Sequence, residues 1–173
     1  MTSHGDPHAR KRLTRGAAAN FGGSTLFDRI ARVVCEAECL PRKELFESWE
    51  VARRVHRRMK GGRAVDLACG HGLLGDILLI LDKTRTSAVG IDRRLPESGA
   101  RLRAALVEAW PFLKERWTLT QGDLRTLPLG AGDVVVSAHA CGGLTDVVLE
   151  RASAARASAS GPSRRARSAA SRA

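Results

Sequence analysis

Residues 65–72 read Val-Asp-Leu-Ala-Cys-Gly-His-Gly, and Asp92 follows at the end of a second apolar run, residues 88–91. The stretch combines a buried strand that ends in an acidic residue, a glycine-rich turn that opens a helix, and a second carboxylate about 20 residues further on. These parts in this order are typical of a nucleotide-type cofactor site, in which the second carboxylate binds a ribose. The stretch therefore predicts a cofactor-binding fold.

The chain around this turn alternates between short apolar runs and longer amphipathic segments. Strands are expected at residues 63–67, 87–91, 117–120 and 134–137, and helices at residues 73–81, 97–110 and 145–155. Strands and helices that alternate with short links predict a parallel sheet with right-handed crossovers. The expected fold class is α/β.

Two amphipathic helices are expected before the first strand, within residues 24–60. Ser24 has the side chain of a helix N-cap, and Pro41 suits the first turn of the second helix. Residues 1–23 are polar and basic, and we expect them to form a flexible leader.

The bulk composition narrows the class of protein. A length of 173 residues allows one domain, and an apolar content of 43% is that of a globular protein. The longest apolar run, residues 77–81, is far shorter than the roughly 18 residues of a membrane span. The polar N-terminus does not resemble a secretory signal. We expect a cytoplasmic protein with no membrane partner.

The four cysteines are expected to be small buried thiols and not metal ligands, because no Cys-x-x-Cys spacing occurs. Cys69 and Cys141 follow the first and fourth expected strands, which places them near each other beside the cofactor.

The net charge of +11 is unevenly distributed. Residues 151–173 contain six arginines and no acid, residues 1–15 contribute about +3, and residues 16–150 carry only about +2. Basic tails can bind phosphate backbones without sequence preference. We interpret them mainly as solvated arms.

The turn after the first strand resembles motif I of the class I S-adenosylmethionine-dependent methyltransferases, acidic-x-Gly-x-Gly-x-Gly. Asp66 takes the acidic position, Gly70 and Gly72 stand at two glycine positions, and Ala68 replaces the first glycine. Such glycines let the backbone pass close to a ligand without a Cβ collision. The resemblance implies that this turn, Cys69 included, contacts the methionine part of S-adenosylmethionine.

Two further acids match cofactor contacts of the same family. Asp92 matches the acid that binds the ribose hydroxyls, with Arg93 beside it at the cofactor. Asp123, after the third expected strand, matches the acid that meets the adenine amine. Three acids at consecutive strand ends share one edge of a parallel sheet, and they are a more specific signal than the glycines alone.

A dinucleotide-binding dehydrogenase is the alternative for this site, because Gly70, Gly72 and Gly75 have the spacing Gly-x-Gly-x-x-Gly. The acid that precedes the turn, Asp66, and the Arg93-Arg94 pair favour the methyltransferase.

Residues 137–146 read Ser-Ala-His-Ala-Cys-Gly-Gly-Leu-Thr-Asp. The string is similar to one in a methyltransferase branch that includes tRNA 2′-O-methyltransferases of the Trm-thirteen type and vertebrate methyltransferase-like proteins. In class I methyltransferases the acceptor and the catalytic groups lie here. We expect His139 to act as a general base or to orient the acceptor. Asp146 would cap the next helix or hold the histidine tautomer. The alternative for His139 is a buried side chain with its hydrogen bonds satisfied.

The resemblance covers residues 41–150 and then stops. The family's sheet has seven strands, of which this chain supplies four, and the branch's Pro-Cys-Cys-His-like string is missing. Residues 151–173 contain only Ala, Ser and Arg besides one Gly and one Pro, and we expect a disordered tail that resembles out-of-frame coding.

The expectation is a Rossmann-like methyltransferase fold with a mostly parallel sheet, incomplete at the C-terminus, with an N-terminal helical preface. Residues 61–150 would form a partial S-adenosylmethionine-binding domain.

The expected function is the transfer of a methyl group from S-adenosylmethionine to an O or N nucleophile, with RNA as the leading acceptor. Two alternatives stay open: an inactive or truncated methyltransferase remnant, and a basic nucleic-acid-binding protein. The sequence leaves the oligomeric state open.

Overall fold

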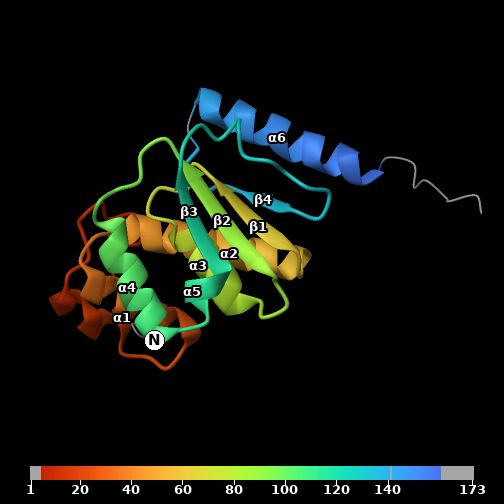
Figure 1. Cartoon of the computed structure of the whole chain (residues 1–173). Helices are drawn as coiled ribbons and strands as arrows, with labels where there is room; N and C mark the ends of the chain where they lie inside the picture. Colours follow the sequence, from red (N-terminus) through yellow and green to blue (C-terminus); the bar gives the residue numbers. More distant parts are fainter. Residues whose placement is uncertain (1–4, 141, 161–173) are drawn as a thin grey trace, which may run out of the picture.

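The computed structural model describes residues 5–140 and 142–160, with side chains up to residue 155. Its centre is one parallel sheet in the order β3-β2-β1-β4 (Figure 1). The strands are β1 Arg63–Leu67, β2 Ser87–Asp92, β3 Trp117–Gln121 and β4 Val134–Val136. The α/β class and the parallel pairing are confirmed, and the order gives a Rossmann-like fold with the fourth strand beside the first.

Strand β1 is buried on both sides, as a central strand of a parallel sheet must be. Ala64 belongs to the core on one face, whereas Val65 and Leu67 belong to the smaller core on the other face. Its neighbours are in register, with Asp66 opposite Gly90 on β2 and Val136 on β4. The strand therefore delivers Asp66 to the interior.

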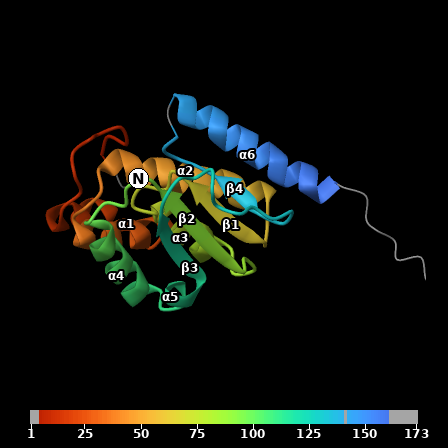
Figure 2. The same cartoon turned by 45° about the horizontal axis from the view of Figure 1, so that its top comes forward.

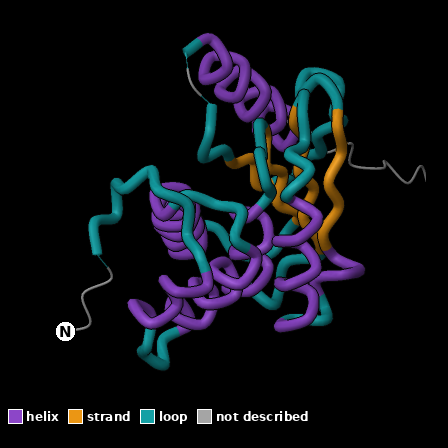
Figure 3. The backbone as a smooth tube through the Cα atoms, turned by 90° about the vertical axis from the view of Figure 1, so that its left-hand side faces the viewer, coloured by secondary structure: helices purple, strands orange, loops and turns teal. Residues whose placement is uncertain are grey.

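Most helices cover one face of the sheet, as Figure 3 shows. They are the 3-10 helix η1 Arg15–Phe21, α1 Leu26–Ala37, α2 Arg42–Arg58, α3 Leu73–Leu81, α4 Gly99–Ala109 and α5 Leu113–Arg116. Helix α3 packs on β1 and β2, and α2 packs on α3. The two N-terminal helices are thus part of the same core as the sheet.

The N-terminal segment differs from its predicted role as a flexible leader. Leu13 and Phe21 are fully buried, and the ring of Phe21 meets that of Phe27 edge to face, with centroids 6.0 Å apart. Arg12 forms an isolated bridge with Pro41. Helix α1 begins one residue later than predicted, because Thr25 and not Ser24 is its N-cap and accepts from the N–H of Asp28 at 3.1 Å.

Helix α6, Gly143–Ser160, lies on the opposite face of the sheet, apart from the other helices (Figures 1 and 2). Its partly buried residues Leu144, Val147 and Val148 pack against the smaller core. The helix runs five residues beyond the predicted end, so residues 151–160 of the expected disordered tail are helical. Residues 161–173 lie outside the described residues. Within the described ranges, none of the helices has both the length and the apolarity to cross a membrane.

Candidate functional site

The glycine-rich turn lies at the carboxyl edge of the sheet, between β1 and α3. The N–H of Cys69 donates to the carbonyl of Ile91 at 3.2 Å, and the N–H of Gly70 donates to Oδ2 of Asp92 at 2.9 Å. The turn is therefore held to the end of β2 partly by the side chain of Asp92, which the sequence analysis predicted as a site residue.

The turn has a left-handed backbone at three positions, with φ of 60° at Ala68, 54° at Gly70 and 83° at Gly72. L-residues with a Cβ rarely adopt this conformation. Ala68 is one of two residues other than glycine with a positive φ in the part of the chain that the structure describes. The alanine at the first glycine position of the motif is accommodated at a cost in backbone strain.

Two of the three glycines in the dinucleotide-like spacing are explained by packing. A Cβ on Gly72 would come within 2.8 Å of Leu119 Cδ2, and one on Gly75 within 2.7 Å of Trp117 Cζ2. A Cβ on Gly70 would meet its nearest atom, His139 Cδ2, only at 3.6 Å. Gly70 is the glycine that faces the candidate site.

Asp66 is the most unusual residue of the site. The residue is 1% exposed, and neither carboxyl oxygen has a hydrogen-bond partner among the described residues. Burial raises the pKa of Asp66 well above its usual range, and the nearby charges of Asp92 and Glu44 raise it further. A buried polar group without a partner is costly in a folded chain, which makes this carboxyl a candidate ligand group.

Asp92, the last residue of β2, organises the surrounding loops. Besides the contact to Gly70, its Oδ1 accepts from the N–H of Arg94 at 3.2 Å, and its carbonyl accepts from the N–H of Gly122 at 2.8 Å. Each carboxylate oxygen has a further lone pair for a ligand hydroxyl. The side chain of Arg93 is exposed beside it.

Asp123 lies in the turn after β3, and its contacts stay within that turn. Its Oδ1 accepts from the N–H of Arg125 at 2.9 Å, and this hydrogen bond holds the pKa of Asp123 below its usual value. The side chain is 43% exposed and also faces the Arg125 guanidinium at 3.6 Å. Asp123 reaches the same edge of the sheet as Asp66 and Asp92 without contacting either.

His139 follows β4 and lies close to Glu44, a residue that the sequence interpretation missed. Oε1 of Glu44 is 3.6 Å from Nε2 of His139 and 3.2 Å from Nδ1 of His71. Nε2 of His71 in turn lies 3.1 Å from Oγ of Ser98. Helix α2, the glycine-rich turn, the N-cap of α4 and the loop after β4 thus meet at this point. The sequence analysis predicted only His139 of this cluster. The signal for His71 was its place inside the glycine-rich turn, whereas Glu44 arrives through the packing of α2.

The other predicted residues near β4 lie differently. Asp146 is exposed in the first turn of α6, and no contact joins it to His139 in the described part of the chain, so the carboxylate beside His139 is Glu44. Cys69 is buried against β2, where a Cβ on Gly90 would meet its sulfur at 2.9 Å. Burial raises the pKa of the Cys69 thiol. Cys141, its expected neighbour, lies outside the described residues.

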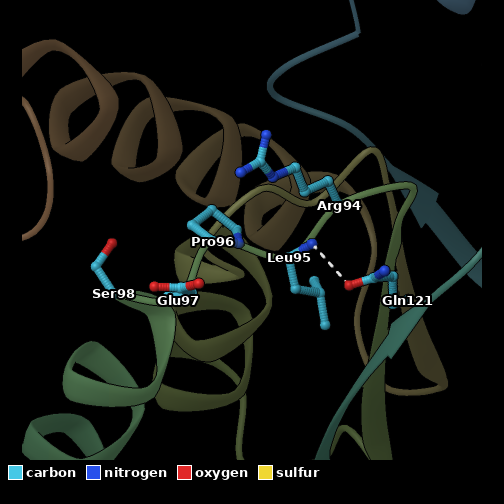
Figure 4. A pocket seen from close by; sticks show the side chains of 6 residues that line it. All are labelled: Arg94, Leu95, Pro96, Glu97, Ser98 and Gln121. Carbon is cyan, nitrogen blue, oxygen red and sulfur yellow. Dashed lines mark hydrogen bonds between the residues drawn. The ribbon is translucent and has the colours of Figure 1, made fainter.

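Two hollows flank the loop that follows Asp92. One of about 680 Å³ is lined by the residues that Figure 4 labels, where the N–H of Leu95 donates to Oε1 of Gln121 at 3.5 Å. The other, of about 350 Å³, is lined by Gly70 and His71 on one side and by residues of α4 on the other. The second hollow puts open space against the glycine-rich turn, and neither hollow is lined by Asp66, Asp92 or Asp123.

The residue set fits S-adenosylmethionine on observations within this chain. The unpartnered carboxyl of Asp66, the open side of Gly70 and the spare acceptor capacity of Asp92 are what a ligand with cationic and hydroxyl groups would use. Among the described residues, no group of three or more His, Cys, Asp or Glu side chains is arranged to hold a metal ion.

No protein-family model and no curated protein sequence matches this chain. Solved structures that resemble it include S-adenosylmethionine-dependent methyltransferases. The methyltransferase SibL is 22% identical with a TM-score of 0.45, over 83% of this chain and 43% of SibL. A protein from Pyrococcus horikoshii, provisionally assigned as an RNA methyltransferase, is 16% identical with a TM-score of 0.46, over 65% of this chain and 55% of its own.

Mitomycin 7-O-methyltransferase MmcR is 18% identical with a TM-score of 0.41, over 78% of this chain and 46% of MmcR. The chain thus matches about half the length of each of these proteins. At such scores and identities the likeness says nothing of substrate or activity.

Proposed function

We propose that this chain binds S-adenosylmethionine above the turn at Gly70 and supports methyl transfer to an O or N nucleophile. The observation that carries the proposal is the buried carboxyl of Asp66, which has no partner in the described structure. A fold tolerates such a group where a ligand completes it, because leaving it unpaired costs about 1–3 kcal/mol.

The sign of the charge at the turn favours this ligand over a dinucleotide. Asp66 lies within the electrostatic reach of two further carboxylates, Asp92 and Glu44. The charges of Asp92 and Glu44 favour a cation, and S-adenosylmethionine carries a sulfonium and an ammonium group, whereas a dinucleotide would bring two phosphates. The packing roles of Gly72 and Gly75 against Trp117 also account for the dinucleotide-like spacing without a pyrophosphate.

Each predicted cofactor residue has a proposed part. Asp92 accepts from the ribose hydroxyls, while Asp123 meets the adenine amine with the oxygen that Arg125 leaves free. The backbone of the turn, from Ala68 through Cys69 and Gly70 to Gly72, lines the methionine part. Arg93 lies at its rim.

S-adenosylmethionine supplies a methyl group on a positively charged sulfur, so the protein needs to orient the acceptor and remove its proton. His139 is the proposed base, since a neutral imidazole can accept a proton from a hydroxyl or an amine. Asp146, in the first turn of α6, places a negative charge where the helix dipole favours one.

RNA is the proposed acceptor class. The support is the exposed basic end of α2, where Arg53, Arg57 and Arg58 face solvent, together with exposed Lys60 just after the helix. Such a surface binds phosphate backbones without reading sequence.

Calorimetry of the full chain with S-adenosylhomocysteine tests the proposal. We expect binding, and a loss of about 10- to 100-fold in affinity for Asp92→Ala, which removes a charged hydrogen-bond acceptor. Asp92→Asn keeps an oxygen for the N–H of Gly70 and separates loss of charge from collapse of the turn. Glu115→Ala is the control, because Glu115 is exposed on α5 at the opposite edge of the sheet.

Absence of S-adenosylhomocysteine binding by the natural chain, or equal binding by the Asp92 variants, would overturn the methyltransferase site. Binding of NADH instead would establish the dinucleotide alternative. On the same samples, an RNA oligonucleotide titrated over a salt series should lose affinity when Arg53 and Arg57 become Glu. Unchanged RNA affinity would remove the RNA acceptor from the proposal.

A further inference from the structure

We propose that Glu44 is a positioning residue that holds His139 with Nε2–H toward its carboxylate and leaves Nδ1 free to take the acceptor's proton. The inference rests on the proposed function and deepens it. It makes the N-terminal helix α2 a component of the catalytic centre.

The geometry places one carboxylate between two imidazoles. The side chains of Glu44, His71 and His139 are only 14%, 15% and 29% exposed. A carboxylate oxygen can accept from two donors, so Glu44 Oε1 suits an N–H from each ring. The 3.6 Å to His139 is longer than a hydrogen bond, and catalytic pairs are often long in proteins without a ligand and tighten in the complex.

The two histidines are not equivalent. His71 has both ring nitrogens engaged, Nδ1 with Glu44 and Nε2 with the hydroxyl of Ser98. Nδ1 of His139 makes no hydrogen bond in the described part of the chain, so His139 alone has a nitrogen available as a base. His71 therefore fixes the carboxylate in place.

The orientation of the His139 ring agrees with this assignment. Its Cδ2 edge faces Gly70, and the adjacent Nε2 faces Glu44. In an imidazole, Nδ1 lies across the ring from the Cδ2–Nε2 bond, so it points away from both. Nδ1 is thus left open on the side of the ring away from the turn at Gly70, so an acceptor would reach it from the side opposite this turn.

In the proposed step, the O–H or N–H bond of the acceptor breaks and its proton bonds to Nδ1 of His139. The electron pair stays on the acceptor atom and makes it the stronger nucleophile. Because Nε2 keeps its proton, the ring becomes an imidazolium beside the Glu44 carboxylate, which stabilises the charge as the carboxylate of a catalytic triad does.

Nitrogen NMR of the histidine side chains in the full chain, at a pH where the rings are neutral, tests the inference. We expect His71 as the Nδ1–H tautomer and His139 as the Nε2–H tautomer. In Glu44→Ala the ratio of Nε2–H to Nδ1–H in His139 should fall about tenfold, the equivalent of about 1.4 kcal/mol from a charge-assisted hydrogen bond. Glu44→Asp, which keeps the carboxylate, should restore part of the ratio.

Glu47→Gln is the matched control, because Glu47 lies on the same helix and pairs with Lys43 at the surface. It should leave both rings unchanged. Tautomers of His71 and His139 that stay the same in Glu44→Ala would overturn the inference. S-adenosylhomocysteine titrated into the same samples keeps the two proposals apart, because a natural chain that fails to bind it defeats the proposed function whatever the tautomers do.

Discussion

Asp66 is a carboxyl group that the fold buries beside two other acids and leaves without a hydrogen-bond partner. At the scale of single residues, this arrangement opposes stability. Asp76 shows the contrast, because it is also buried but pairs with Arg103 at 2.8 Å, and burial raises the pKa of Asp76 to about 7. Of these two buried carboxyl groups, Asp66 has no partner and is the one that lies next to the candidate site.

The raised pKa of Asp66 predicts how stability depends on pH. The folded chain keeps a proton on Asp66 that the unfolded chain releases above about pH 4, so the free energy of unfolding falls as the pH rises through the window between the two pKa values. Asp76 acts in the same direction up to about pH 7. Asp66→Asn removes the first contribution.

We therefore expect Asp66→Asn to match the natural chain at pH 4 within about 0.5 kcal/mol and to be more stable by about 1–3 kcal/mol at pH 8. Urea unfolding at both pH values measures this difference. Glu115→Gln, at an exposed acid, should change stability by less than about 0.5 kcal/mol at either pH. An Asp66→Asn variant that is less stable at pH 8 would show that the carboxylate has a partner in solution.

Residue spacing alone predicted Asp66, Gly70 and Asp92, because these lie on one strand–turn–helix unit and on the strand next to it. It could not predict Glu44, whose place depends on how α2 packs on α3. It assigned His139 to the site but not the carboxylate beside it. Local patterns identify the groups that one unit of the fold presents, and long-range packing supplies the rest.

At the scale of elements, the contact between α3 and β3 depends on a glycine. Trp117, at the start of β3, is buried against Gly72, Gly75 and Gly90, where a side chain would collide with its ring.

The sequence predicted helix α3 with its observed ends, and strands β1 to β4 to within one residue. It could not show that Gly75 serves a tryptophan 42 positions away.

Gly75→Ala should lower the free energy of unfolding by about 1–3 kcal/mol, because the new methyl would lie within 2.7 Å of the Trp117 ring. Gly99→Ala is the matched control in α4, where a Cβ would meet nothing within 4 Å, and it should raise stability by about 0.5–1 kcal/mol. Thermal or urea unfolding measures both. Equal effects from the two substitutions would contradict the packing described for Trp117.

At the scale of the whole molecule, the chain before α1 is part of the core. The composition of residues 1–23 suggested a solvated leader because their few large apolar residues show no helical or strand period. Leu13 and Phe21 are nevertheless buried, because each packs in the same core as residues of α1 and α2. Isolated anchors of this kind have no signature in sequence.

Phe21→Ala should cost about 3–5 kcal/mol of stability, as expected for a large side chain with no exposed surface. Met59→Ala, at a residue that is 43% exposed, should cost less than about 0.5 kcal/mol. Urea denaturation monitored by tryptophan fluorescence measures both. If Phe21→Ala unfolds at the same urea concentration as the natural chain, the leader is not anchored in solution.

The cover that α2 gives to α3 decides how this protein can be divided. Nearly every residue of α3 is buried, from Leu73 through Ile80, and without α2 the apolar side chains that α2 covers would meet water. A fragment that began at Gly61 would keep the sheet and the glycine-rich turn but would expose an apolar face of α3. We expect this fragment to precipitate on expression. We therefore expect residues 61–150 to need α2 in order to stay folded.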